Sequence, residues 1–515
     1  MPWIPGQPSL EDWENRFPSC DAVPTVRCED LSPDAFRAEF MSKNLPVMIT
    51  GITDDWRARR EWVTKDGQPD VVAMSELFGD AKVLVVDCDE AIDTDLKRRE
   101  MPFREFASWW QSSETRKRAA AGAAAREKLY VKDWNFVGDF PAYGAYDTPP
   151  HVRDDWLNDC GSNEDDKNEN ENENENENDD ARLRPGSFRF VYLGVEGTWT
   201  PMHVDVARSY SWSANVCGRK KWLMVPPSRV KYLRHRDGSG RLIPDVRAAR
   251  LASARADFPD ASLAAPLTVH QPPGALLFVP SCWAHQVHNE TDCLSINHNW
   301  FNDCTFGVSV AYLRDESRTI RLGLPDRDDR ADGVLCQRLL ARKAGINQLH
   351  LGSIGVWGLR RVLDSTCASE ANSEANSFQE KRSHRARRLA NVFQPLRHLV
   401  HETHFFATRD VCEREFGEFN EGNEYSYRPC HPGVGSLLGL VVSAPRARSP
   451  TEETSRARKE ADAFVESFDV DPWEEDADRL AEIVDVLRRA ADDPVFGEES
   501  DEEAPEEPRA DRQPP

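Results

Sequence analysis

Residues 200–205 read Thr-Pro-Met-His-Val-Asp and contain two potential metal ligands, His203 and Asp205. Successive side chains of a β-strand point to opposite faces, so a strand here predicts that the imidazole and the carboxylate share one face. A second imidazole, His285, ends the run Phe-Val-Pro-Ser-Cys-Trp-Ala-His of residues 278–285, just after an apolar strand and a turn. Two histidines and one carboxylate suit non-haem Fe(II), because this facial triad leaves three coordination positions open. A structural zinc site would be closed by four ligands.

The residue types alone leave the choice of the third ligand open. His288 and His298 follow His285 closely in the sequence, and either imidazole is also available. An HxD motif is by itself a weak signal, because short motifs recur by chance and a strand histidine is more often a packed or surface group. A second imidazole after a strand and a turn strengthens the hypothesis of a metal site.

A basic cluster follows in residues 217–227, which read Cys-Gly-Arg-Lys-Lys-Trp-Leu-Met-Val-Pro-Pro. The apolar run after the glycine predicts a strand in which Lys220 shares a face with Trp222 and Met224, while Lys221 points the other way. An oxygenase that uses a dicarboxylic oxo-acid needs a buried cation to hold the carboxylate remote from the metal. Lys220 is the candidate for that cation. The alternative interpretation is that these charges are solvated in a hairpin.

The distribution of short strands and helices indicates the fold class. Residues 30–160 mix helical patterns with short apolar strands, which suggests an α+β region. The sequence Ser32-Pro33-Asp34 predicts a helix start, with a capping hydroxyl, a proline in the first turn and an acid near the positive end of the helix dipole. Beyond residue 185, closely spaced β-type runs are divided by glycine and proline, as is typical of a barrel or a sandwich. After Asn302 the pattern becomes helical and rich in arginine.

These patterns predict five consecutive parts of the chain. The tract from Asn163 to Asp180 alternates Asn and Glu without an apolar residue, so it cannot offset its ordering entropy by burial. In chain order the parts are a helical and mixed N-terminal part of the catalytic module (1–160), a disordered insert (161–184), a β-barrel catalytic core (185–305), a helical region with a low-complexity break near 366–378 (306–490) and an acidic disordered tail (491–515).

The charge of the 515-residue chain is concentrated in two segments. The formal net charge is −24, of which residues 163–180 carry −9 and residues 498–515 carry −6. The remaining body is therefore only mildly acidic. This balance disfavours nucleic acid as a partner, because non-specific binding needs many Lys and Arg side chains to displace counterions.

The compartment is predicted from the cysteines and from the absence of targeting patterns. The 12 cysteines include no CxxC pair, and the first residues lack the pattern of a secretory signal. No apolar run approaches the ~18 residues of a membrane span. We expect a protein of the cytoplasm, with the nucleus as a second compartment if the basic run of residues 381–388 is an address.

Several motifs in this chain resemble those of the JmjC (Jumonji C) oxygenases, which have the cupin fold. They are Thr200-Pro-Met-His-Val-Asp205, Gly218-Arg-Lys-Lys-Trp222, Pro226-Pro227, Pro280-Ser-Cys-Trp-Ala-His285, Asn289 and Asn297-His-Asn-Trp300. A closer resemblance is to the branch that contains a lysyl hydroxylase of the eukaryotic translation release factor. It rests on Asn44-Leu-Pro-Val-Met-Ile-Thr-Gly51, Leu129-Tyr-Val-Lys-Asp-Trp134, Asp154-Asp-Trp-Leu-Asn158 and Ser209-Tyr-Ser-Trp-Ser-Ala-Asn-Val-Cys-Gly218.

The resemblance implies a fold and a set of site residues. The fold is α+β, with a double-stranded β-helix (cupin or jelly-roll) core flanked by N- and C-terminal helices. The implied iron ligands and catalytic residues are His203, Asp205 and His285, where His285 is preferred over His288 because it follows the Pro-x-x-Trp-x turn. The implied contacts to the co-substrate 2-oxoglutarate are Lys220, Thr200, Asn215 and Asn297. The required cofactor and co-substrates are Fe(II), 2-oxoglutarate and dioxygen.

The resemblance also implies a reaction and a partner. It points to a dioxygenase that hydroxylates a lysine side chain of a protein, the translation release factor. Demethylation of histone N-methyl-lysine and hydroxylation of a tRNA base are alternatives that use the same cofactor. A catalytically inactive cupin-like binding module is the alternative outside enzymes, because a fold alone does not determine a function.

Overall fold

The computed structural model describes residues 9–92, 95–119, 128–160, 188–324 and 329–348, with isolated positions from 350 to 395. All of these except Arg388 belong to one of two compact units, the unit formed by Met1–Val362 and Asn391–Pro432. The predicted insert at 161–184, the break near 366–378 and the tail at 491–515 lie outside the described residues.

A nine-stranded sheet combines strands from the N-terminal part with strands from the predicted core. In spatial order its strands are β1 (Thr25–Arg27), β2 (Val47–Thr50), β11 (Leu276–Val279), β8 (Tyr210–Cys217), β13 (Cys293–Trp300), β6 (Arg189–Gly194), β5 (Leu129–Trp134), β3 (Lys82–Ile92) and β4 (Asp95–Pro102). Neighbours are antiparallel except β1 and β2, which are parallel. The N-terminal part is therefore continuous with the barrel rather than a separate sheet.

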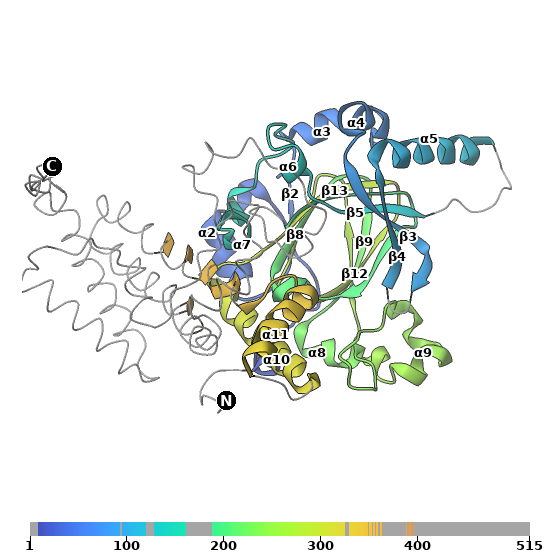
Figure 1. The fold of residues 1–515 in the computed structure, drawn as a ribbon. Helices are drawn as coiled ribbons and strands as arrows, with labels where there is room; N and C mark the ends of the chain where they lie inside the picture. The colour runs from blue at the N-terminus through green and yellow to red at the C-terminus, as the bar shows by residue number, and fades with distance from the viewer. Residues whose placement is uncertain are drawn as a thin grey trace, which may run out of the picture. The chain divides into compact units, whose positions relative to one another are not determined.

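A second, four-stranded antiparallel sheet faces the first one. Its order is β10 (Leu267–Gln271), β9 (Lys220–Val225), β12 (Ala284–Asn289) and β7 (Trp199–His203). Side chains from both sheets meet in one apolar cluster, for example Trp222 and Met224 of β9 with Leu277 of β11. Two facing antiparallel sheets with this core form the predicted jelly roll, so the fold class is confirmed (Figure 1).

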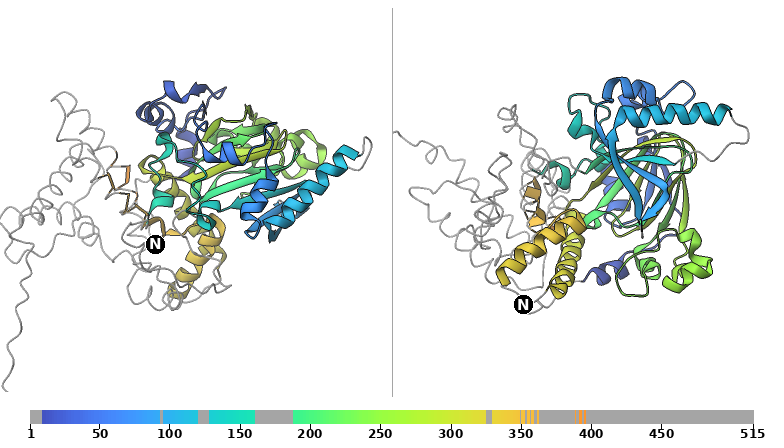
Figure 2. Two further views of the ribbon diagram at one scale, coloured as in Figure 1. Left: turned by 90° about the horizontal axis from the view of Figure 1, so that it is seen from above. Right: turned by 45° about the vertical axis from the view of Figure 1, so that its right-hand side comes forward.

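Helices surround the two sheets (Figure 2). They are α1 (Leu10–Arg16), α2 (Pro33–Phe36), α3 (Arg57–Glu61), α4 (Val71–Phe78), α5 (Phe103–Ala119), α6 (Phe136–Asp139), α7 (Trp156–Asp159), α8 (Pro227–Val230), α9 (Ala252–Asp257), α10 (Asp303–Gly323) and α11 (Asp329–Ala344). Short helical turns are η1 (Cys28–Asp30), η2 (Arg37–Met41), η3 (Pro150–Val152), η5 (Val206–Arg208), η6 (Lys231–Leu233), η7 (Val246–Arg250) and η8 (Ala261–Leu263). In the described part of the chain, none of these helices has both the length and the apolar character needed to cross a membrane.

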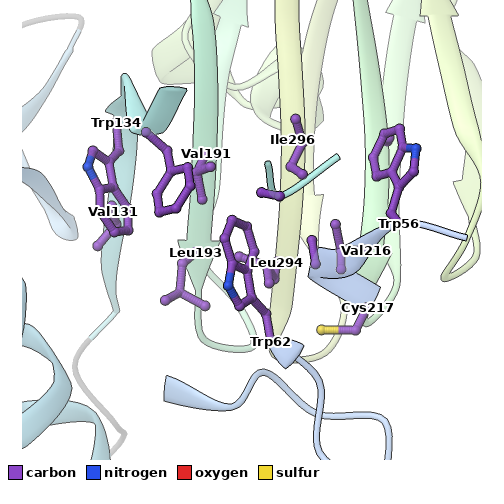
Figure 3. Close-up of a cluster of buried hydrophobic side chains, with 14 of the residues drawn as sticks. Trp56, Trp62, Val131, Trp134, Val191, Leu193, Val216, Cys217, Leu294 and Ile296 are labelled. Carbon is purple, nitrogen blue, oxygen red and sulfur yellow. The ribbon is translucent and has the colours of Figure 1, made fainter. Parts of the chain in front are cut away.

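The largest apolar core lies between the nine-stranded sheet and the N-terminal helices. Trp62 is fully buried and packs edge-on against Phe136 at a ring-centroid distance of 4.8 Å. Strand side chains such as Leu193 and Ile296 belong to the same buried cluster as Trp62 (Figure 3). Burial of such aromatic side chains is a large source of stability. One face of the sheet is thereby held against helices, which leaves its other face to line the barrel.

Local sequence signals located some helix ends correctly. Ser32 accepts a hydrogen bond from the Ala35 backbone N–H at 3.1 Å and caps α2. Asn302 caps α10 through its side chain, so the predicted change to helix after this residue is confirmed. Capping satisfies backbone donors that have no partner within the helix.

One strand prediction near the metal motif is wrong. Strand β7 ends at His203, so Asp205 does not lie on the strand of that histidine. The chain then enters the turn η5, in which Ala207 and Arg208 have φ values of +49° and +58°. His285 follows the apolar strand β11 and a turn, as predicted, and it is the second residue of β12. Strand β12 itself was not predicted, because its buried side chains include polar ones.

Candidate active site

The structure brings His203, Asp205 and His285 together. His203 and His285 face each other across the antiparallel pair β7–β12, with ring centroids 4.2 Å apart. Oδ1 of Asp205 lies 3.9 Å from Nε2 of each histidine. The three potential ligand atoms lie within 4.8 Å of one another. A loop carboxylate therefore completes the set that two strands begin.

Hydrogen bonds orient all three side chains for metal binding. Nδ1 of His203 lies 2.8 Å from the Pro201 carbonyl oxygen, and Nδ1 of His285 lies 3.1 Å from the Trp283 carbonyl oxygen. Because a carbonyl only accepts, each Nδ1 carries the proton and each Nε2 keeps its lone pair. This arrangement of donors fits Fe(II) and leaves positions for further ligands.

Desolvation in the pocket keeps His203 neutral. Desolvation, followed by the adjacent His285 imidazole, lowers the pKa of His203 to about 4. A neutral imidazole is the form that binds a metal. The site is therefore ready for a metal ion over the physiological pH range.

The three side chains open into a pocket of about 490 Å³ between the two sheets. Its wall combines the candidate ligands with polar and aromatic side chains. These are Arg98, Tyr130, Lys132, Asp133, Phe188, Phe190, Tyr192, Thr200, Pro201, Met202, His203, Asp205, Val206, Ser211, Lys220, Trp222, His285, Val287, Asn297 and Asn299. A pocket of this size suits a small co-substrate together with one substrate side chain.

Lys220 lies inside this pocket, as the strand period predicts. It is 2% exposed, and its Nζ donates to Asn289 Oδ1 at 3.0 Å and to the Tyr130 hydroxyl at 3.4 Å. Burial lowers the pKa of Lys220. Gly194 stands opposite Tyr130, where a Cβ atom would come within 2.5 Å of the tyrosine ring. The glycine thus allows Tyr130 to approach the buried ammonium group.

The other predicted co-substrate residues occupy different positions. Thr200 and Asn297 line the pocket, and Asn297 Oδ1 accepts a hydrogen bond from Ser213 at 3.2 Å. Asn215 is fully buried but is not part of the pocket wall. Its side-chain amide donates to the Gly218 carbonyl at 2.7 Å, so it braces the turn that precedes Lys220.

The two alternative histidines lie elsewhere. His288 stacks on the Trp199 ring at 5.7 Å, and His298 is fully buried beside Tyr146, whose hydroxyl lies 2.5 Å from its Nε2. Neither residue belongs to the pocket wall. The geometry therefore favours His285 among the three candidates.

Sequence reasoning missed the contribution of strand β5. Tyr130, Lys132 and Asp133 line the pocket although they lie far from the metal motif in the chain. The segment Leu129-Tyr-Val-Lys-Asp-Trp134 contributed only to the family resemblance. Its alternation of apolar and polar residues was the available signal for a strand with one pocket-facing side.

Comparison with known proteins agrees with this fold and site. Residues 33–306 match the family of cupin-like domains. An Arabidopsis thaliana protein named arginine-specific demethylase JMJ20 is 37% identical over 333 residues, which cover 63% of this chain and 67% of that protein. Two further relatives are named 2-oxoglutarate and iron-dependent oxygenase JMJD4. The Gallus gallus protein is 35% identical, and the match covers 62% of this chain and 70% of that protein. The Homo sapiens protein is also 35% identical, and the match covers 60% of this chain and 69% of that protein.

The two-sheet barrel and the three convergent ligand side chains are the features of a cupin-like metalloenzyme. The chain belongs to the JmjC family of 2-oxoglutarate- and iron-dependent oxygenases within the cupin-like proteins.

Proposed function

We propose that this oxygenase hydroxylates a lysine side chain of a protein substrate, the eukaryotic translation release factor, in the cytoplasm. His203, Asp205 and His285 hold the iron, and Lys220 with Thr200 holds the distal carboxylate of 2-oxoglutarate. Asn297 is a further contact from the pocket wall. Asn215 does not contact 2-oxoglutarate but stabilises the turn before Lys220.

The observation that carries this proposal is a carboxylate in the exposed part of the pocket wall. Asp133 lines the pocket and is exposed. Its Oδ1 accepts a hydrogen bond from the Tyr192 hydroxyl at 2.6 Å, which holds the carboxylate in place. A carboxylate at this position can pair with a cationic side chain that enters the pocket. Lysine is such a side chain.

The protein supplies geometry and the cofactor supplies the oxidation. Iron held by His203, Asp205 and His285 would supply, with 2-oxoglutarate and dioxygen, the oxidation that replaces a substrate C–H hydrogen by hydroxyl and converts the oxo-acid to succinate and carbon dioxide. His203 and His285 keep neutral Nε2 atoms toward the pocket, and Ser211 orients the Asp205 carboxylate by a hydrogen bond of 2.7 Å. Asp133 holds the charged end of the substrate, so that a carbon of its side chain is presented to the ligand cluster.

Arginine demethylation is a second candidate function. The Arabidopsis relative is named as an arginine-specific demethylase. A more distant relative, 24% identical, is named bifunctional arginine demethylase and lysyl-hydroxylase psr-1 in Caenorhabditis briggsae. A methylated guanidinium group is also a cation, so Asp133 suits this substrate as well.

Mass spectrometry of the products separates these functions. The full chain, loaded with Fe(II) under anaerobic conditions, is mixed with 2-oxoglutarate, air and purified release factor, and the factor is then mapped by tandem mass spectrometry. We expect one added oxygen on a lysine, formed together with succinate, and no product with His203→Ala. Loss of a methyl group from a methylarginine or histone methyl-lysine peptide, or an added oxygen on a tRNA base, with an unmodified release factor would contradict the proposal.

A matched pair of variants tests the role of Asp133. Asp133→Asn keeps the shape of the side chain and removes its charge, so the KM for the release factor should rise by about tenfold. Asp89→Asn, at an exposed site paired with Lys128, is the control and should leave the KM unchanged. An equal KM in both variants would remove the support that Asp133 gives to a cationic substrate.

A further inference from the structure

Strand β5 departs from regular pairing where it lines the pocket. The register with β6 shifts by one residue between Val131 and Trp134, so Lys132 and Asp133 both stand opposite Tyr192. Asp133 has a φ value of +55°, in the left-handed region that few non-glycine residues adopt. A β-bulge of this kind redirects side chains and is common beside active sites. As a result, two consecutive residues of opposite charge line the same pocket.

Lys132 is a buried cation without a partner in the described part of the chain. It is 9% exposed and lines the pocket, but it makes no hydrogen bond or ion pair with those residues. The adjacent carboxylate does not neutralise it, because Asp133 is bonded to Tyr192 instead. A buried unpaired charge is costly, and this cost falls when an anion binds to it. Lys132 therefore indicates an anionic ligand.

Lys132 lines the same pocket as the deep cation, Lys220. Lys132 is two residues from Tyr130, on the same face of β5, and Tyr130 contacts the ammonium group of Lys220. Burial lowers the pKa of Lys220, and the positive charge of Lys132 lowers it further. Lys132 also shares the pocket wall with the candidate metal ligands His203, Asp205 and His285.

We propose that Lys132 binds the carboxylate of 2-oxoglutarate that adjoins its oxo group, while Lys220 binds the distal carboxylate. This inference rests on the family's use of 2-oxoglutarate. Two ammonium groups in one cavity repel each other, and a dicarboxylate that spans them relieves this repulsion at both ends. A hydrogen bond between two charged groups is stronger than one between neutral groups.

The bulge provides one residue for the co-substrate and a different residue for the substrate side chain. A lysine or methylarginine side chain is itself cationic, so it does not suit the ammonium group of Lys132. The cationic substrate side chain suits the carboxylate of Asp133 instead. Asp133 is exposed, whereas Lys132 is buried. One irregularity in β5 thereby provides a cation for the bound oxo-acid and an acid for the incoming side chain.

Ligand titrations without any protein substrate test this assignment. The full chain is loaded with Mn(II) and titrated by calorimetry with 2-oxoglutarate, and in competition with 2-oxobutyrate, which lacks the distal carboxylate. We expect Lys132→Met to weaken both ligands by about tenfold or more, whereas Lys220→Met weakens only 2-oxoglutarate. Lys132→Arg keeps the charge and should stay within about threefold of the wild type. Lys128→Met is the control, because Lys128 is a half-buried lysine just before the same strand that pairs with Asp89 and does not line the pocket.

The proposal is overturned if Lys132→Met binds 2-oxoglutarate as the wild type does. It is also overturned if the variant loses affinity for 2-oxoglutarate alone, because Lys132 would then act on the distal carboxylate. Lys132→Gln replaces Lys132→Met if unfolding midpoints show that the latter does not fold. Because no protein substrate is present, these outcomes are independent of whether the release factor is the substrate.

Discussion

The hydroxyl of Ser211 donates a hydrogen bond of 2.7 Å to Oδ2 of Asp205, and Oδ1 of the same carboxylate lies 3.9 Å from Nε2 of both His203 and His285. One carboxylate oxygen is thus held by the protein, and the other is left for a metal. Strand β8 supplies the serine, so the orientation of this loop residue depends on the nine-stranded sheet.

Removal of this hydrogen bond should weaken metal binding without unfolding the protein. We expect Ser211→Ala to lower the affinity for Fe(II) or Mn(II) by about 10–100-fold, as is typical when the partner of a ligand is lost. Ser295→Ala is the matched control, because Ser295 is a buried strand serine whose hydroxyl has no hydrogen-bond partner among the described residues. Equal metal affinities in the two variants would show that Asp205 does not need Ser211.

Loss of the carboxylate ligand should abolish the stabilisation that a metal confers. At a free metal concentration of 100 times Kd, binding adds about 2.7 kcal/mol to the free energy of unfolding. Mn(II) should therefore raise the unfolding midpoint of the wild type and have no effect on Asp205→Ala. A chelator should reverse the shift in the wild type. A metal-dependent shift that persists in the variant would place the metal elsewhere.

Two adjacent lysines provide a direct test of the strand alternation. Lys220 is buried in the pocket, whereas Lys221 points away from it and is half-buried. Lys220→Met should raise the KM for 2-oxoglutarate by about 10–100-fold, since a hydrogen bond to a charged group contributes about 1.5–3 kcal/mol. Lys221→Met should leave this KM unchanged. Steady-state succinate formation at varied 2-oxoglutarate concentration measures both values.

The buried carboxyl group of Asp155 should make stability depend on pH. Burial raises the pKa of Asp155 from 3.8 to about 7. The folded state therefore binds a proton that the unfolded state has released between pH 4 and pH 7, and the contribution of this group to stability falls as the pH rises through that range. We expect Asp155→Asn, despite a disturbed contact to Asn158, to show a flatter dependence. Unfolding midpoints of both proteins from pH 4.5 to 8 measure the difference, and parallel curves would contradict it.

Local sequence patterns were sufficient where neighbouring residues decide the structure. The period of two residues placed Lys220 and Trp222 on the pocket side of β9, because that strand is regular over its whole length. The capping residues Ser32 and Asn302 marked helix starts, since their hydrogen bonds are made within three residues. The same reasoning failed for Asp205, because strand β7 ends two residues earlier and Asp205 already precedes the turn η5.

The sequence patterns by themselves determined a barrel or sandwich of short strands, the residue types of the metal site and the alternation that buries Lys220, because strand period and side-chain chemistry are properties of short segments. The residue types left His285, His288 and His298 as alternatives, and the family resemblance implied the jelly roll and His285. Only the tertiary structure showed that His285 lies beside His203 and Asp205, and it alone brought β5 to the pocket. The bulge at Lys132 and Asp133 depends on how β5 pairs with β6, and that register is set by packing between segments distant in the chain. Which side chains converge on the site was therefore decided by strand pairing rather than by any local motif.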